Sequence, residues 1–346
     1  MQGSWKTAWQ IAFTYIGTVV GAGFASGREI VEFFVQYGTQ GLAGILLATA
    51  LFTWAGTRVM LISYRIQADS YQDVSTYLFG HPFGMVFNSL LLTVLLGTTS
   101  VMLAATGAIF WESFQLPSQV GIWISMLMIF VVTRKGLFAI HRVNSIFVPT
   151  LVAFTLLVFL YTQPWKDPIL ISESPRAWAW LSSPLSYVAL NVSLTQAVLV
   201  PIGRHSTSEK PLIAGGIIGG LGIGLLLILA YSSLAVEMPD IQHAEMPMIA
   251  LLHGVGRGIP LLFSLLVYAE IFSTLVANVF GLAEQLRQVT HLRGPTVLFG
   301  ILIITYFISF IGFSSLLRLL YPLFGQLVVF FLVMLFYRQW RGRTLS

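Results

Sequence analysis

The sequence predicts an all-helical integral membrane protein with about ten transmembrane helices. Of its 346 residues, 56% are hydrophobic and only 9% are charged, whereas about a quarter of the residues in soluble domains are charged. The hydrophobic residues also gather into long segments, and the ~30 Å core of a bilayer requires about 20 apolar residues in a helix. These two observations exclude a soluble enzyme and a nucleic-acid-binding protein.

Ten apolar segments of suitable length follow one another along the chain. They lie at about 7–37, 41–63, 83–111, 117–133, 143–162, 178–202, 211–236, 259–283, 295–312 and 314–337. No change of composition separates a second domain, so residues 1–346 are interpreted as one transmembrane domain. Lys6 precedes the first segment and no small-residue cleavage site follows it, so we expect a retained first helix rather than a signal peptide.

The basic residues predict the orientation of these segments. If the N-terminus is cytoplasmic, twelve basic residues lie on the cytoplasmic side and three (Lys166, Arg176 and Arg257) on the other. The twelve are Lys6, Arg65, Arg134, Lys135, Arg142, Arg204, Lys210, Arg287, Arg293, Arg338, Arg341 and Arg343. Because cytoplasmic loops carry an excess of Lys and Arg, we expect both termini to be cytoplasmic.

Glycines cluster in the middle of the first segment. Gly17, Gly21, Gly23 and Gly27 fall within 11 residues, and each costs about 1 kcal/mol relative to alanine inside a helix. One interpretation is a broken helix, whose freed amide groups would face an anion and whose freed carbonyl groups would face a cation. The other is a straight helix that uses its small residues for close packing.

Polar residues interrupt the sixth segment. Asn191, Ser193, Thr195 and Gln196 fall within six residues, and interhelical hydrogen bonds would explain one such residue more easily than four. The first and sixth segments hold corresponding places in two halves of five. Because interrupted helices in corresponding positions indicate a transporter built from inverted repeats, we expect both helices to be broken.

The expected repeats cover about 7–162 and about 178–337, with a substrate between the two breaks. Asn191, Ser193 and Thr195 would then contact its amino group or side chain. The seventh segment also holds many glycines, which we interpret as a close-packing surface because no phosphate-binding Lys-Ser/Thr pair accompanies them.

Charged residues inside a membrane segment indicate function by default. Glu270 lies near the middle of the eighth segment, and Ser273 and Thr274 share its helical face at i+3 and i+4. Three oxygen-bearing groups suit a small hard cation, although a buried glutamate could also bond a neighbouring helix. In the outer half of the first segment, Arg28 and Glu32 either neutralise each other at i,i+4 or act as a vestibule that attracts or gates the solute.

The first segment resembles the start of the YkvI family of bacterial membrane proteins. The resemblance rests on Ile-Gly-Thr-Val-Val-Gly-Ala-Gly-Phe-Ala-Ser-Gly-Arg-Glu at 16–29 and extends over nearly the whole chain in the number, order and spacing of the segments. It implies membership of the amino acid–polyamine–organocation superfamily, whose LeuT fold consists of five plus five inverted helices. It also implies a bacterial cytoplasmic (inner) membrane location.

The resemblance further implies where ligands bind. A substrate carboxylate would lie on the backbone amides of Gly21, Ala22 and Gly23, beside Phe24. The tenth segment departs from the pattern, because it offers only Arg318 where relatives carry an acidic partner of an outer gate.

The cation site combines both sources of inference. Carbonyl groups before the break, at Gly17 and Val20, help to hold sodium in the relatives, and the hydroxyls of Ser273 and Thr274 would complete the site. Glu270 has two open roles: it adds charge to the sodium site, or it carries a proton and leaves that site without a function.

The predicted function is secondary active transport of an amino acid or similar small solute by alternating access, coupled to sodium or, through Glu270, to protons. The alternative is a non-transporting ligand sensor on the same fold. The expected partners are a sodium ion, the solute and the lipid bilayer. We expect no catalytic residues, no other cofactor and no nucleic-acid partner, and the oligomeric state stays open.

Overall fold

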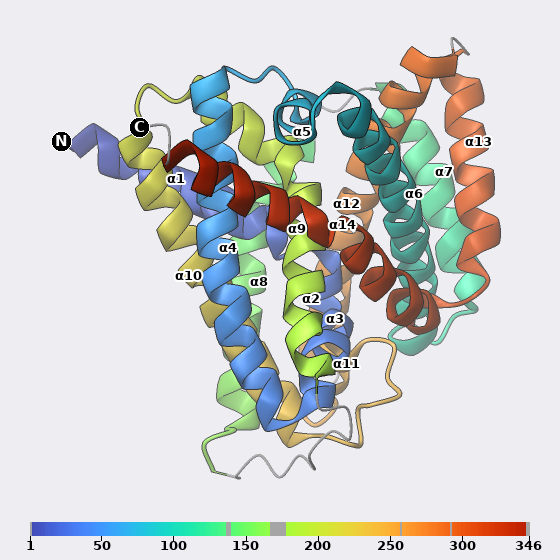
Figure 1. Ribbon diagram of the computed structural model, residues 1–346. Helices are drawn as coiled ribbons and strands as arrows, with labels where there is room; N and C mark the ends of the chain where they lie inside the picture. Colours follow the sequence, from blue (N-terminus) through green and yellow to red (C-terminus); the bar gives the residue numbers. More distant parts are fainter. Residues whose placement is uncertain (1, 136–139, 167–177, 257, 291–292, 344–346) are drawn as a thin grey trace.

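The structure is a computed structural model that describes residues 2–135, 140–166, 178–256, 258–290 and 293–343. This part of the chain is helical with short connections and contains no strand. In chain order its helices are α1 (Gln2–Val19), α2 (Ala22–Ser26), α3 (Arg28–Phe33), η1 (Val35–Tyr37), α4 (Thr39–Ile66), α5 (Tyr71–Phe79), α6 (His81–Glu112), α7 (Ser118–Lys135), α8 (Ile140–Thr162), α9 (Ala179–His205), α10 (Glu209–Val236), α11 (Pro247–Ala250), α12 (Gly258–Thr290), α13 (Gly294–Ser309) and α14 (Phe313–Arg343). They form one bundle, with α11 at the end opposite the start of α1 (Figure 1).

Helices lie over each predicted segment, and the first segment is divided into α1, α2, α3 and η1. Within the described residues, α4, α6, α9, α10, α12 and α14 are long and apolar enough to cross a membrane, and α7, α8 and α13 contain shorter apolar helices. The protein is therefore a multi-pass helical membrane protein, whereas the count of ten spans and the inverted repeat stay predictions. Arg176 and Arg257, which entered the predicted orientation, lie outside the described residues.

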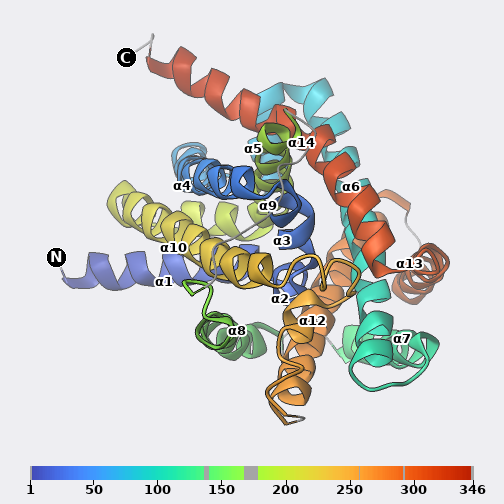
Figure 2. The ribbon, with the colours of Figure 1, turned by 90° about the horizontal axis from the view of Figure 1, so that it is seen from below.

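Glycines on α10 allow it to lie between α1 and α4, as both views show (Figures 1 and 2). On one face, Gly216, Gly220 and Gly224 contact Thr57, Thr53 and Thr49 of α4. On the other face, Gly215, Gly219 and Gly222 contact Ile11, Tyr15 and Ile16 of α1. The structure thus agrees with the packing interpretation of these glycines.

We expect Gly220→Ala to lower the melting temperature of the detergent-purified protein. A Cβ atom there would stand 2.5 Å from the Cα atom of Thr53, and overpacking of this kind costs about 1–3 kcal/mol. Gly300→Ala on α13 is the matched control, because nothing lies within 4 Å of its added methyl group. A Gly220→Ala variant as stable as Gly300→Ala would contradict this packing.

The predicted break in the sixth segment is wrong, because α9 is one continuous helix from Ala179 to His205. Its polar side chains bond to the backbone of their own helix. The Asn191 amide donates to the Tyr187 carbonyl (2.9 Å), and the Thr195 hydroxyl donates to the Asn191 carbonyl (2.6 Å). Such i to i−4 bonds satisfy polar side chains inside an intact helix, so a polar cluster does not require unwinding.

Candidate functional site at the break in the first span

The predicted break in the first segment is present between α1 and α2. Gly21 has extended backbone angles (φ −105°, ψ −157°), and its amide donates to the carbonyl of Val19 at 3.0 Å. The carbonyl of Gly17 consequently loses its helical donor. A second interruption follows at Gly27, whose φ of +81° separates α2 from α3 and suits glycine because it lacks a Cβ atom.

The break offers backbone groups of both kinds. Ala22 and Gly23 begin α2, where amides have no intrahelical acceptor, and no described hydrogen bond reaches the carbonyl of Gly17 or Val20. The Gly21 amide, in contrast, already has an acceptor. The chain turns sharply enough here to close this local bond, and the expected contact between Gly21 and a substrate stays a prediction.

The break lies against α12, as the cation-site prediction requires. A Cβ atom on Gly21 would stand 4.0 Å from the hydroxyl oxygen of Thr274, and Ser273 is buried. Glu270, one turn away on α12, is also buried, and no described group bonds to its Oε2 atom. The structure thus brings Thr274 to the break, while the binding of an ion there stays a prediction.

Glu29 lies with Arg28 and Glu32 in the outer half of the first segment, but the sequence did not assign it to the binding site. Its carboxyl group lies directly against Gly23, so that any side chain at position 23 would overlap it. The hydroxyl group of Tyr321 on α14 lies beside this carboxyl group. The sequence feature that could have revealed this contact is the pair Gly23 and Gly27 before Glu29, because two glycines so close together allow the chain to fold back on itself.

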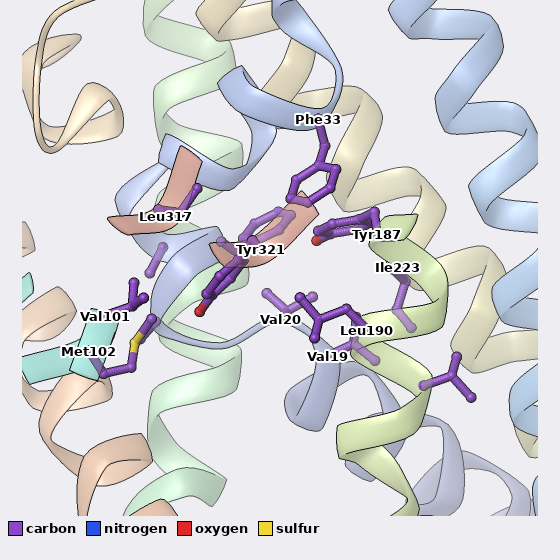
Figure 3. Packing of buried hydrophobic residues seen from close by; sticks show 14 of the residues in the cluster. Val19, Val20, Phe33, Val101, Met102, Tyr187, Leu190, Ile223, Leu317 and Tyr321 are labelled. Carbon is purple, nitrogen blue, oxygen red and sulfur yellow. The ribbon is translucent and has the colours of Figure 1, made fainter. Parts of the chain in front are cut away.

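Aromatic rings surround this region. Phe33, Tyr187 and Tyr321 come from α3, α9 and α14 and are drawn close together, with Val20 below them in this view (Figure 3). The rings of Phe33 and Tyr187 have centroids 5.1 Å apart. The Tyr187 hydroxyl is buried and has no hydrogen-bond partner among the described residues. The site is therefore mostly apolar, with a few polar groups of fixed position.

The predicted contacts on α9 are only partly available. Asn191 and Thr195 use their donor groups within the helix, while the Ser193 hydroxyl is buried and lacks a described partner. Phe24 is buried on α2. None of these positions establishes a substrate contact, so all four stay predictions.

The segment 237–256 connects α10 to α12 and contains α11. It covers the end of the site that lies nearest to α11. Arg28, only 2% exposed, donates to the carbonyls of Gln242 (2.7 Å) and Ala244 (3.4 Å) in this segment. The Glu112 carboxylate at the end of α6 accepts the amides of Glu245 (2.6 Å) and Met246 (2.9 Å). These bonds fasten the segment to two helices.

Further contacts close the same end. Glu245 accepts hydrogen bonds from the amide and hydroxyl of Ser314, at 2.8 and 2.7 Å, where α14 begins. The side chain of Met248 on α11 occupies the room left by Gly27, because a Cβ atom there would stand 2.6 Å from its Cγ. The segment 237–256 therefore seats α11 on the turn between α2 and α3.

Arg28 and Glu32 form no direct ion pair with each other among the described residues, although the charge of Glu32 lies close enough to act on Arg28. Arg28 turns to the loop carbonyls, whereas Glu32 pairs with Arg318 of α14, with 3.4 Å between Glu32 Oε2 and Arg318 Nε. The Glu32 side chain is 11% exposed and that of Arg318 is 59% exposed. An ion pair therefore joins the first and tenth predicted segments. Its acidic residue lies on the first segment and its basic residue on the tenth, whereas the resemblance implied an acidic residue on the tenth.

We expect Glu112→Ala to loosen the segment 237–256. The wild-type chain has no cysteine, so in a Met248→Cys background only that thiol reacts with a membrane-impermeant maleimide. Charge-assisted hydrogen bonds contribute about 1.5–3 kcal/mol each, so losing two of them should raise the labelling rate roughly tenfold or more. Glu237→Ala is the control, since Glu237 is exposed in the same segment and only its backbone carbonyl has a described hydrogen bond. Equal labelling rates in the two variants would refute this role of Glu112.

Comparisons with known proteins agree with this architecture. The uncharacterized membrane protein YkvI of Bacillus subtilis (strain 168) is 38% identical over 340 residues, covering 96% of both chains. The uncharacterized protein YyaD of the same organism is 28% identical over 335 residues, again covering 96% of both. No model of an established protein family matches the sequence.

Solved structures of transporters share the fold. A manganese transporter of Eremococcus coleocola matches 96% of this chain and 79% of its own, with a TM-score of 0.64 and 16% identity. Mhp1, a nucleobase-cation-symport-1 family transporter, matches 90% of this chain and 74% of its own in a closed conformation, with a TM-score of 0.59 and 13% identity. These proteins are transporters rather than enzymes, and at such identities they establish the fold alone. With its broken first span and its full-length similarity to a membrane protein, the chain belongs to the family of YkvI.

Proposed function

We propose that this protein is a secondary active transporter that moves an amino acid or a similar small solute across the cytoplasmic membrane by alternating access. The observation that carries the proposal is the break at Gly21, which frees backbone groups in the interior of the bundle and exposes them to buried polar side chains. Inside a membrane, such irregular backbone is tolerated only where protein or a bound solute satisfies it. The transporter fold of the solved neighbours supports the same conclusion.

Alternating access requires an end that closes, and the segment 237–256 supplies one. The arrangement of basic residues in the sequence assigns this end to the outer side of the membrane, with both termini in the cytoplasm. In the proposed cycle the bonds of Arg28 and Glu112 and the pair between Glu32 and Arg318 form when the outer side closes.

We further propose sodium as the coupling ion. It would bind between the carbonyls of Gly17 and Val20 and the hydroxyls of Ser273 and Thr274. The position of Thr274 beside the break supports this arrangement. The competing scheme places the coupling proton on Glu270, whose buried carboxyl group lies one turn away.

Uptake into proteoliposomes tests the transport proposal. The purified protein is reconstituted, and accumulation of radiolabelled amino acids is measured with an inward sodium gradient, with an inward proton gradient and with neither. We expect gradient-dependent accumulation of at least one amino acid. Binding of solute without any uptake would overturn transport and favour the sensor function.

A further inference from the structure

Glu29 is a buried carboxylate without a partner of opposite charge among the described residues. Glu29 is 6% exposed, it forms none of the described ion pairs, and the polar group named beside it is the neutral hydroxyl of Tyr321. The adjacent Arg28 points to the carbonyls of Gln242 and Ala244 instead. Burial of an uncompensated charge is costly, so a cation that binds beside Glu29 would stabilise the ionised form of its carboxyl group.

The surroundings of Glu29 favour a compact organic cation. Aromatic rings attract cations through their π-faces. The rings of Phe33, Tyr187 and Tyr321 are drawn together in Figure 3, and Tyr187 and Tyr321 lie within range of the Glu29 charge. The phenol groups of Tyr187 and Tyr321 both lie close enough to Glu29 to interact with its charge. An ammonium group has three donors and no acceptor. It matches the carboxylate of Glu29 together with the Tyr187 hydroxyl, which has no other described partner.

A divalent metal ion fits this place less well. Such ions require several oxygen or nitrogen ligands, and the described residues contain no group of three His, Asp or Glu side chains that could hold one. A substrate carboxylate fits less well too, because the Glu29 carboxyl group already lies against Gly23 and would repel it.

We propose that Glu29, with Tyr187 and Tyr321, binds the ammonium group of the transported solute, and that this group rather than a carboxylate is the part of the solute that the protein requires. The inference rests on the proposed function and narrows it to solutes that carry a primary ammonium. Amines without a carboxylate therefore belong to the substrate class. Gly23 acts as a positioning residue, since its missing side chain leaves the room in which the carboxyl group of Glu29 lies.

Matched ligand triplets test the proposal. The melting temperature of the purified full-length protein is measured with each amino acid, with the amine obtained by removing its carboxylate, and with the acid obtained by removing its amino group. Because a ligand of the folded state stabilises by mass action, we expect at least one amino acid and its amine to raise the melting temperature, while the matching acid does not. A panel in which acids stabilise and amines do not, or in which no ammonium compound stabilises, would overturn the proposal.

Variants assign the response to Glu29. Removing one member of a buried charge pair costs about 2 kcal/mol or more, so Glu29→Gln should weaken the affinity for the amine at least about 30-fold, whereas Glu29→Asp, which keeps the charge, should retain measurable binding. Glu209→Gln is the control, because Glu209 pairs with Arg65 away from the break. A similar comparison applies to the ring of Tyr187: Tyr187→Phe should bind the amine more tightly than Tyr187→Leu. Unchanged amine affinity in a folded Glu29→Gln variant would refute the assignment.

The experiments distinguish failure of the ammonium-site proposal from failure of the transport proposal. If amines bind through Glu29 but are not accumulated by proteoliposomes, transport is wrong and the ammonium site stands. If proteoliposomes accumulate a solute that has no ammonium group, transport stands and the ammonium site is wrong. Stabilisation by Mn²⁺ alone that disappears in Glu29→Gln would replace the organic cation by a metal ion.

Discussion

Gly23→Ala should abolish uptake, while Gly21→Ala should leave most of it. A methyl group at position 23 would overlap the Glu29 carboxyl group and stand 2.9 Å from its Cγ atom, so this side chain must move away. At position 21 the nearest atom lies 4.0 Å away and the backbone is extended. Because the displaced group is the flexible end of a side chain, we expect the fold to survive and the binding to be lost.

The measurement is the initial rate of proteoliposome uptake, with the melting temperature as a check of folding. Loss of a buried charged contact costs about 2–5 kcal/mol, so the uptake rate at low substrate concentration should fall by about 30-fold or more in Gly23→Ala and by less than about threefold in Gly21→Ala. Gly21→Leu, with its longer side chain, should reach the α12 hydroxyls and impair binding as well. Equal rates in Gly23→Ala and the wild type would show that the position of Glu29 does not matter for transport.

The second large effect concerns the coupling ion. In the double variant Ser273→Ala with Thr274→Ala, we expect substrate binding to lose most of its sodium dependence. In the proposed site, carbonyl groups freed at the break would replace part of the water around sodium, and the loss of two hydroxyl ligands would leave its coordination incomplete. The sodium concentration at half-maximal binding should rise roughly tenfold or more.

Two further variants give this experiment its control and its alternative. Ser264→Ala removes a buried hydroxyl from the same helix near Ser113, far from the break, and should not change the sodium dependence. Glu270→Gln should retain part of the sodium response if sodium couples transport. If protons couple it, Glu270→Gln should stop gradient-driven uptake but spare exchange, and sodium should have no effect. Binding that ignores both sodium and pH would refute both coupling schemes.

The sequence alone predicted the positions of the long helices and the break in the first of them. Apolar length is a local property that follows from the thickness of the bilayer, so six of the predicted segments coincide with long apolar helices in the described residues. Four glycines close together weaken a helix regardless of how the rest of the chain folds. The glycine faces of α10 were predictable in the same way, since small residues at helical spacing permit close packing.

The sixth segment shows where local information ended. A polar cluster is equally compatible with an unwound helix and with side chains that bond their own helix, and only the folded chain selects between them. In α9, Asn191 and Thr195 bond the preceding turn, so the helix stays intact. The prediction of a second break failed for this reason.

Tertiary structure also decided the partners of the charged residues. From the sequence, Arg28 and Glu32 are neighbours on one helix, yet Arg28 bonds the segment 237–256 and Glu32 pairs with Arg318. Glu29 acquires its place only because Gly27 turns the chain and α14 brings Tyr321 alongside. Helix positions and the first break depend on residues close in the sequence, whereas the carboxylate at the centre of the site depends on helices that meet only when the whole bundle has assembled.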